Sequence, residues 1–353
     1  MTTFAGIVGA GNISETHLRA VQETPGLEIA AVTGRNVDRS QALAAQFGCI
    51  AYSRFQDFLV HKPMDLVIIG SPSGLHAEQG IAAAENGLHV LVEKPIDISL
   101  ERTDALIDCC QKARVRLGVI FQDRTKPDIN KLRELILSGG IGDPILVSAR
   151  VKWYRPPDYY SKSHWRGTWA LDGGGALMNQ GIHTVDLLLW LLGDVTRVYA
   201  RALTALHKIE AEDTVVATLE FARGAVGTLE ATTAAFPGYD RRVEITGSNG
   251  TVTLERDKIV RLHLARPVAG FQGSSETDQN PSANSPVVSD IRGHRTVIQD
   301  FVRAIETGAD PLCGGFEGRR SVALVHAIYQ SARTAQPVTL SQSARQSHLA
   351  PFA

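Results

Sequence analysis

The chain has no excess of charge of either sign. Its 36 lysines and arginines are balanced by 37 aspartates and glutamates, which gives a formal net charge of -1. Proteins that bind nucleic acid or lie on anionic membranes concentrate basic residues on one surface, and this sequence contains no block of like charge. We therefore expect neither nucleic acid nor a membrane surface among its partners.

Cysteine is scarce, and long apolar runs are missing. The four cysteines include an adjacent pair, Cys109 and Cys110, which is a poor arrangement for a disulfide, and none of the four has the spacing of a metal site. No apolar run reaches the roughly 18 residues of a membrane-spanning helix. Residues 1–12 lack the basic start of a signal peptide. These absences favour a reduced, cytoplasmic protein without a metal cofactor.

The sequence does contain enough apolar material for two hydrophobic cores. It has 353 residues, of which 44% are hydrophobic and 21% charged, as is usual for globular proteins. A chain of this length exceeds what one core normally supports, so we expect two domains. The pattern of elements changes near residue 123, which predicts a first domain over 1–123 and a second over 124–353.

The first domain alternates apolar strand patterns with amphipathic helix patterns. Strands that are apolar throughout are typical of a parallel sheet covered on both faces, which is the doubly wound α/β class. Ligands of such sheets bind at the carboxyl ends of the strands. The main predicted strands cover residues 3–8, 27–34, 65–72, 89–93 and 116–122.

A glycine-rich turn follows the first predicted strand. The motif GAGNIS places Gly9 and Gly11 where a dinucleotide pyrophosphate approaches the backbone, and Asn12 and Ile13 where the next helix begins. Ser14 stands where a third glycine is usual and is still small enough for close packing. In this context the motif predicts a dinucleotide-binding turn formed by these residues.

The end of the second strand bears on the choice of dinucleotide. An acid at that position would bind the free 2′-hydroxyl of NAD, but the strand ends in TGRN, and Asp38 lies too far into the next helix. Arg35 could instead contact a 2′-phosphate or lie flat on the adenine. We therefore expect NADP(H) in preference to NAD(H), with a solvated loop cation as the alternative role of Arg35.

The predicted strand at 89–93 runs into Glu93, Lys94 and Pro95. A lysine at a carboxyl end points into the ligand cleft, where it can hydrogen-bond a substrate hydroxyl and stabilise an alkoxide while hydride leaves. Glu93 could pair with Lys94 or orient it, and Pro95 fixes the turn, with a cis peptide as one option. A structural salt bridge is the alternative explanation for Lys94. Gln122 and Lys126, after the last strand, are expected to face the same cleft.

The second domain has a different pattern of predicted elements. Residues 145–153 and six later segments between 195 and 265 alternate as in antiparallel strands with one buried face. Helices are predicted at 293–307 and 317–334, and the stretch 268–290, rich in serine, glycine and asparagine, reads as a long loop that could cover the substrate. We expect an α+β domain with an open-faced, mostly antiparallel sheet.

One helix of the second domain carries polar residues. It is predicted from Gly175 to Leu192, with Asn179, His183 and Asp186 near one face by their spacing. A histidine there could remove the hydroxyl proton of a carbinol while the carbon loses hydride, with Asn179 holding the ring. A satisfied core histidine is the alternative. His294 could also reach the site or cap its helix.

These motifs, taken in order, resemble the Gfo/Idh/MocA oxidoreductases, named for glucose-fructose oxidoreductase and inositol dehydrogenase. The resemblance rests on GAGNIS, SPSGLH, AAENGLHVLVEKP, GGGALMNQGIHTVDLLLWLLG and VEITGSNGTV, and it extends to AIYQSARTAQPVTL. It implies a Rossmann domain followed by a domain that binds substrate and assembles the protein into a homodimer or homotetramer. The implied activity is hydride exchange between a nicotinamide cofactor and a hydroxyl of a sugar, sugar acid, sugar nucleotide or polyol.

The resemblance also assigns roles to residues. Lys94 corresponds to the catalytic lysine and His183 to the acid or base, while Asn179 replaces an aspartate present in many members. Ser71, Pro72 and His76 lie in the turn that lines the cofactor in the family.

The run SHWRGTWALDGGGALMNQGIH is similar to the subgroup that acts on sugar-nucleotide uronates. It implies that Trp165 and Arg166 face the substrate, with Tyr154, Arg155 and Tyr159 in the same segment. A packed aromatic loop is the alternative for that segment.

Two other functions within the same fold remain to be separated from the dehydrogenase. One is a regulator that binds dinucleotide without catalysis, which the presence of Lys94 and His183 disfavours. The other is a glycoside hydrolase that retains its NAD and oxidises the sugar only transiently. Cofactor that never leaves, without net reduction of added cofactor, would distinguish it.

Overall fold

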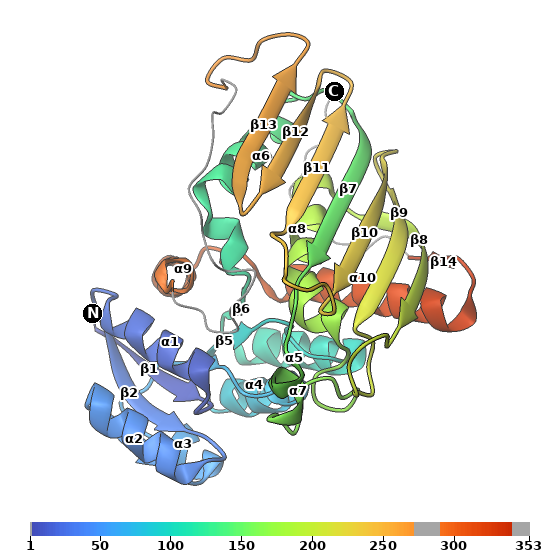
Figure 1. Ribbon diagram of the computed structural model, residues 1–353. Coiled ribbons are helices and arrows are strands. Elements are labelled where there is room, and N and C mark those ends of the chain that lie inside the picture. Colours follow the sequence, from blue (N-terminus) through green and yellow to red (C-terminus); the bar gives the residue numbers. More distant parts are fainter. Residues whose placement is uncertain (1, 272–289, 341–353) are drawn as a thin grey trace. The chain divides into compact units, whose positions relative to one another are not determined.

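The computed structural model describes residues 2–271 and 290–340 and divides into two compact units (Figure 1). The first unit contains the described parts of Met1–Gln122, Ala170–Gly173 and Val287–Val322, and the second contains those of Asp123–Trp169, Gly174–Pro286 and Ala323–Ala353. The sequence predicts that all residues after 123 belong to the second domain. The structure differs, because two later segments complete the first unit.

The first unit is built on a parallel sheet with strand order β3-β2-β1-β4-β5-β6. This confirms the predicted doubly wound class. The order reverses between β1 and β4, which is where such sheets bind their ligands. The strands are β1 (Thr3–Val8), β2 (Leu27–Thr33), β3 (Ile50–Tyr52), β4 (Leu66–Ile69), β5 (His89–Glu93) and β6 (Leu117–Ile120).

The helices of this unit begin and end at local signals. Asn36 caps α2 by accepting the backbone N–H of Arg39, and Gly48 ends that helix in the left-handed region. Ser99 caps α5 in the same way. The helices and short turns are α1 (Asn12–Gln22), α2 (Val37–Phe47), α3 (Phe55–Leu59), η1 (Ser73–Leu75), α4 (His76–Glu85), α5 (Leu100–Ala113) and α9 (Arg292–Thr307).

Helix α9 supplies part of the core of the first unit although it lies far along the chain. Val297, Ile298 and Phe301 are buried in the same cluster as Ile7 and other strand residues. Burying a side chain such as Phe301 contributes about 2 to 3 kcal/mol. A β-carbon on Gly118 of β6 would lie 2.7 Å from the Phe301 ring, so the glycine permits this close approach.

The second unit contains an eight-stranded sheet with order β13-β12-β11-β7-β10-β9-β8-β14. Its pairs are antiparallel except for β7 with β10, which is parallel, so the prediction of a mostly antiparallel sheet is confirmed. The strands are β7 (Pro144–Lys152), β8 (Val195–Leu203), β9 (Thr214–Phe221), β10 (Val226–Thr232), β11 (Arg242–Gly247), β12 (Gly250–Glu255), β13 (Lys258–Leu264) and β14 (Val338–Thr339).

One face of this sheet is buried and the other is open. Along β9, Val215 and Ala217 are buried whereas Val216 between them is half exposed, and Tyr199 and Val226 are exposed on neighbouring strands. Helices lie against the sheet, with α6 beside β13 and α8 beside β7 (Figure 1). The helices and turns of this unit are η2 (Gln122–Thr125, whose first residue belongs to the first unit), α6 (Pro127–Leu137), α7 (Pro157–Ser161), η3 (Ala176–Gly181) and α8 (Ile182–Leu192).

Helix α10 (Gly315–Thr334) belongs to both units, since the division falls after Val322. No helix in the described parts of the chain is long and apolar enough to cross a bilayer. Most of the loop predicted at 268–290 lies outside the described residues.

Candidate functional site

The turn after β1 has the shape that a bound pyrophosphate requires. Gly9 has φ 117°, and a β-carbon there would lie 2.8 Å from the carbonyl oxygen of Gly70, so a side chain is excluded. At Gly11 a β-carbon would meet nothing within 4 Å of the described residues. Gly11 also offers no side chain to cap α1, which leaves the N–H groups of the first turn available to an anion.

The other residues predicted at this turn lie at the start of α1. Asn12 is exposed, Ile13 is half-buried and Ser14 is buried. The Ser14 hydroxyl finds no hydrogen-bond partner among the residues that the structure describes, as expected where a ligand oxygen could complete the site. The open backbone, the uncapped helix and this hydroxyl fit a dinucleotide.

Arg35 follows β2 directly and is exposed. The side chain of its neighbour Asn36 caps α2. Arg35 is therefore the polar side chain at this strand end that is left to contact a ligand. The contact of Arg35 with a 2′-phosphate stays a prediction.

The turn after β4 is held by its own hydrogen bonds. The Ser71 hydroxyl donates to Gln79, and Pro72 precedes the short turn η1. The His76 ring is 1% exposed and lies between two carbonyl oxygens, with Nδ1 2.8 Å from that of Pro95 and Nε2 2.9 Å from that of Ser71. His76 thus joins the turns that end β4 and β5, and its predicted contact with the cofactor stays a prediction.

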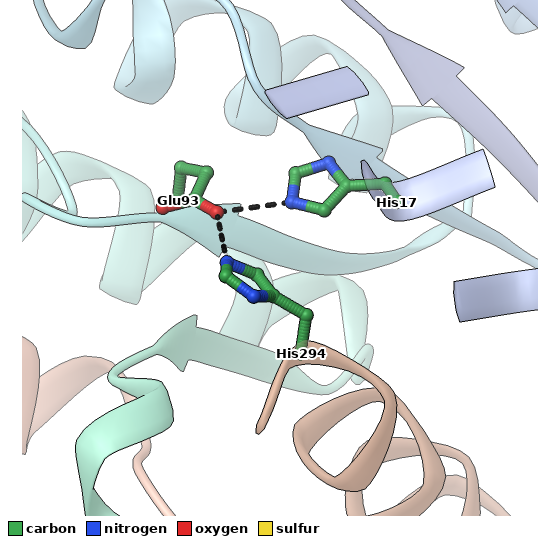
Figure 2. Close-up of side chains that lie close together, drawn as sticks. All are labelled: His17, Glu93 and His294. Carbon is green, nitrogen blue, oxygen red and sulfur yellow. Dashed lines mark hydrogen bonds and ion pairs between the residues drawn. The ribbon is translucent and has the colours of Figure 1, made fainter. Parts of the chain in front are cut away.

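Glu93 at the end of β5 contacts two histidines (Figure 2). Its Oε1 atom lies 2.9 Å from Nε2 of His17 on α1 and 3.4 Å from Nε2 of His294 on α9. Its Oε2 atom accepts the backbone N–H of Lys94 at 3.1 Å. His294 therefore neither caps its helix nor lies on the surface. Lys94 is half-buried and its bond to Pro95 is cis, one of the options predicted from sequence.

The fold thus assembles a group of potential metal ligands that spacing along the sequence did not indicate. Ligand atoms of His17, Glu93 and His294 lie within 4.8 Å of one another.

In the second unit, the predicted helix from Gly175 to Leu192 begins as a wider π-helical turn, η3, before α8 starts at Ile182. The spacing argument assumed a regular α-helix and is wrong over this turn. Asn179 lies in the π-helical turn, and its side-chain oxygen accepts the amide of Gln180.

The other polar residues of this helix find partners far along the chain. Asp186 is buried and forms a two-bond ion pair with Arg124, at 2.7 and 2.9 Å. Nδ1 of His183 lies 3.7 Å from the Asp123 carboxylate, which also receives a hydrogen bond from Arg241. Burial alone would raise the pKa of Asp123, but the charges of Arg241 and His183 outweigh it and hold that pKa below its ordinary value. Asp123 is therefore ionised and can orient an imidazole.

The start of the same helix is anchored by a buried carboxylate that sequence reasoning missed. Oε2 of Glu212 accepts the N–H of Gly175 at 2.9 Å, and Oε1 accepts the N–H of Leu177 and the hydroxyl of Tyr329 at 2.8 and 2.9 Å. Burial raises the pKa of Glu212 to about 7, more than these hydrogen bonds lower it. This carboxylate fixes the turn that leads to Asn179.

The segment after β7 stacks two arginines on aromatic rings. The Arg166 guanidinium lies 4.3 Å from the ring centre of Tyr159 and 5.2 Å from that of Trp165. Arg155 lies 5.4 Å from the Tyr159 ring and 5.0 Å from that of Trp153. The structure therefore brings together the predicted substrate residues Trp165 and Arg166.

Within the described part of the chain, neither Arg155 nor Arg166 has a carboxylate partner. No carboxylate in the described ranges lies within 4.0 Å of Arg155 or Arg166, and the buried Nε atom of each lacks an acceptor there. Arg155 is only 5% exposed. Arg155 donates to the backbone carbonyl of Tyr154 at 3.2 Å. Buried cations are normally paired with anions, so two guanidinium groups without a carboxylate partner among the described residues favour an anionic ligand.

The remaining predicted substrate residues are placed as follows. Tyr154 is half-buried and stacks edge-on against Phe236. Gln122 begins the turn η2 after β6, and Lys126 precedes α6 close enough for its charge to lower the pKa of Asp123.

Comparison with known proteins is consistent with this architecture. A family model described as an oxidoreductase family with an NAD-binding Rossmann fold matches residues 4–121, and the GFO/IDH/MocA C-terminal domain matches residues 129–253. The inositol 2-dehydrogenase of Rhizobium meliloti is 27% identical over 97% of this chain and 100% of its own. A D-xylose 1-dehydrogenase (NADP(+)) of Haloferax volcanii is 29% identical over 95% of this chain and 99% of its own.

Solved structures extend the comparison. The WlbA dehydrogenase from Bordetella pertussis, crystallised with NADH and UDP-GlcNAcA, is 33% identical, with a TM-score of 0.87 over 97% of this chain and 100% of that one. The WlbA enzyme from Chromobacterium violaceum, with the same two ligands, is 30% identical at the same TM-score over 97% of each chain. Two family models and full-length relatives therefore agree, and this chain belongs to the Gfo/Idh/MocA family of NAD-binding oxidoreductases.

Proposed function

We propose that this protein exchanges hydride between a nicotinamide cofactor and a secondary hydroxyl or ketone of an anionic sugar derivative, with sugar-nucleotide uronates as the substrate class. The observation that carries the substrate class is the pair Arg155 and Arg166, buried or half-buried and without carboxylate partners among the described residues. Their guanidinium groups suit a carboxylate or a diphosphate. The WlbA structures with UDP-GlcNAcA support the same class.

The proposed chemistry divides between the two units. The first unit holds the dinucleotide at the Gly9 to Ile13 turn, and the second binds the substrate and forms the subunit interface of a homodimer or homotetramer. When bound, the nicotinamide accepts the hydride in oxidation and returns it in reduction. His183 takes the hydroxyl proton, and Asp123 fixes the imidazole that carries it. The Lys94 ammonium hydrogen-bonds the same oxygen and stabilises its developing negative charge.

The cofactor preference is part of the proposal. Arg35 is exposed after β2, and no acid stands at that strand end to hold a free 2′-hydroxyl. This favours NADP(H), with NAD(H) as the alternative. The Arg35→Ala variant should then weaken NADPH binding much more than NADH binding, whereas equal losses would mean that the arginine only stacks on the adenine.

The test begins with calorimetric titration of the protein with NADPH and NADH. Turnover is then followed by nicotinamide absorbance on a UDP-linked uronate, the matching neutral UDP-sugar, a free sugar acid and neutral polyols. We expect the uronate to have the highest kcat/KM. Arg166→Ala should raise KM for anionic substrates, whereas Arg201→Ala, at an exposed position on β8, should not.

Variants of the proposed catalytic residues complete the test. Lys94→Ala and His183→Ala should each lower kcat about 10²- to 10⁴-fold and leave dinucleotide affinity within about threefold. Normal turnover in either variant would contradict the assignment. Cofactor that stays bound without net reduction would instead favour the NAD-retaining hydrolase, and tight binding without turnover of any substrate would favour a regulator.

A further inference from the structure

Glu93 and the two histidines around it join three elements of the first unit. His17 is on α1, the helix that starts at the glycine turn, Glu93 ends β5, and His294 is in the first turn of α9 (Figure 2). All three side chains are buried, with exposed fractions of 0%, 7% and 2%. Such a cluster in a core can hold either a metal ion or a network of hydrogen bonds.

The hydrogen-bond inventory decides between these possibilities. If Nε2 of each histidine bound a metal, each Nδ1 would carry the ring proton and would need an acceptor. Both Nδ1 atoms are buried, and neither has a hydrogen-bond partner within the described residues. A metal would therefore leave two buried donors unsatisfied in this arrangement, which is expensive.

Without a metal, the same atoms are nearly satisfied. Each Nε2 then carries the proton and points it at Oε1 of Glu93, and each Nδ1 keeps a lone pair, a role that needs no proton acceptor. The second carboxylate oxygen accepts the Lys94 N–H at 3.1 Å. Glu93 is thus held from α1 on one side and from α9 on the other, and it holds the backbone of the next residue.

We propose that His17 and His294 are positioning residues for Lys94, acting through Glu93. They keep the carboxylate ionised and fixed, so that the strand end that carries the lysine cannot shift relative to the dinucleotide turn at the start of α1. This inference rests on the proposed function, because it takes Lys94 as the catalytic lysine. It assigns His17 and His294 a role in turnover rather than in metal binding.

The electrostatics agree with this role. Burial would raise the pKa of Glu93, but the hydrogen bonds from His17 and His294 outweigh it and hold that pKa well below its ordinary value. Burial lowers the pKa of His17, which keeps that ring neutral. Among the described residues, the titratable side chains that interact electrostatically with this carboxylate include His17, His294 and His76. Lys94 contacts it through its backbone N–H. Removing one histidine donor should therefore let the Glu93 pKa rise.

The test compares His17→Phe and His294→Phe, which remove the donor, with His17→Gln and His294→Gln, whose amides can restore it. We expect the Phe variants to lower kcat about 10- to 100-fold and to move the acid limb of the kcat–pH profile upward, with dinucleotide affinity within about threefold. The Gln variants should recover most of kcat. His61→Gln, at a histidine bonded to Tyr52 in the same unit, is the matched control.

Three outcomes would overturn the inference. Phe variants with wild-type kcat and pH profile would contradict a positioning role, and so would equal losses in the Phe and Gln variants. Stoichiometric zinc in the purified protein, absent from the Gln variants, would replace the hydrogen-bonded cluster with a metal site. Lys94→Ala is measured in parallel: if it retains turnover, the proposed function itself fails. If it is inactive while the Phe variants are unaffected, only the present inference fails.

Discussion

Glu93 in the first unit and Glu212 in the second are both buried and both contact three donors, yet their pKa values move in opposite directions. Glu93 contacts two imidazoles and one backbone N–H, and its pKa lies well below the ordinary value. Glu212 contacts two backbone N–H groups and the Tyr329 hydroxyl, and its pKa is raised to about 7. Similar burial and the same number of donors therefore do not fix the charge state.

The difference lies in the kind of donor. Two buried imidazole N–H groups contact one oxygen of Glu93, whereas Glu212 receives backbone amides and a phenol. Desolvation is the largest influence at both sites, and only the histidines outweigh it. The first unit thus keeps a fixed negative charge beside Lys94, and the second keeps a carboxyl that titrates near neutral pH at the start of a helix.

The largest expected effect comes from Glu93→Gln. The amide offers one acceptor where the carboxylate offers two, so a buried donor of His17, His294 or Lys94 is left unpaired. We expect a loss of about 3 to 4 kcal/mol in the free energy of unfolding at pH 8, measured by urea unfolding. Glu85→Gln, at an exposed position, should change little. An unchanged stability in Glu93→Gln would mean that the Glu93 carboxyl is already neutral. The proposed difference in charge state between Glu93 and Glu212 would then be wrong.

Glu212→Gln should remove a dependence of stability on pH. Because the folded protein raises the pKa of Glu212 from 4.5 to about 7, it binds more protons than the unfolded chain between these values. Stability from this group is therefore greatest below pH 4.5 and falls as pH rises to 7, by on the order of 2 to 3 kcal/mol. Thermal unfolding at pH 5 and pH 8 should show this loss in the wild type and in Glu210→Gln but not in Glu212→Gln. A loss that persists in Glu212→Gln must come from another group.

The smallest expected effect is that of Tyr329→Phe, which tests how much a neutral donor contributes to the state of Glu212. Tyr329→Phe removes the hydroxyl that donates to Glu212 at 2.9 Å, which should destabilise the protein by about 1 to 2 kcal/mol at neutral pH. With one donor fewer, the pKa of Glu212 should rise further, so the loss of stability should extend to higher pH than in the wild type. The same unfolding series at pH 7 to 9 checks this. If the pH range over which stability is lost moved to lower values instead, the tyrosine hydroxyl would be disfavouring the ionised form of Glu212.

Local patterns predicted most of the architecture. The alternation of apolar strands and amphipathic helices specified the parallel sheet, and period-two alternation specified the second sheet, because both signals depend on neighbours a few residues apart. The glycine turn at Gly9 and the strand end at Lys94 were found in the same way. The π-helical turn around Asn179 was not, since spacing arguments assume a regular helix.

Contacts between distant residues were beyond such reasoning. His17 meets Glu93 across 76 residues, Arg241 meets Asp123 across 118, and Tyr329 meets Glu212 across 117. The return of residues 290–322 to the first unit is the same kind of feature, and without it the role of His294 could not be inferred. That Arg166 has no carboxylate partner among the described residues likewise depends on the positions of distant acidic residues, which no short motif encodes.

The place of α9 also has a consequence for how the protein is made. About 170 residues separate the end of the first segment of this unit, at Gln122, from the start of α9 at Arg292. At a synthesis rate of about 5 to 20 residues per second, the ribosome takes roughly 10 to 30 s to cover that distance. Throughout that time the nascent Rossmann sheet leaves open the core positions that Val297, Ile298 and Phe301 later fill. The first unit therefore cannot complete its core until most of the chain has been made.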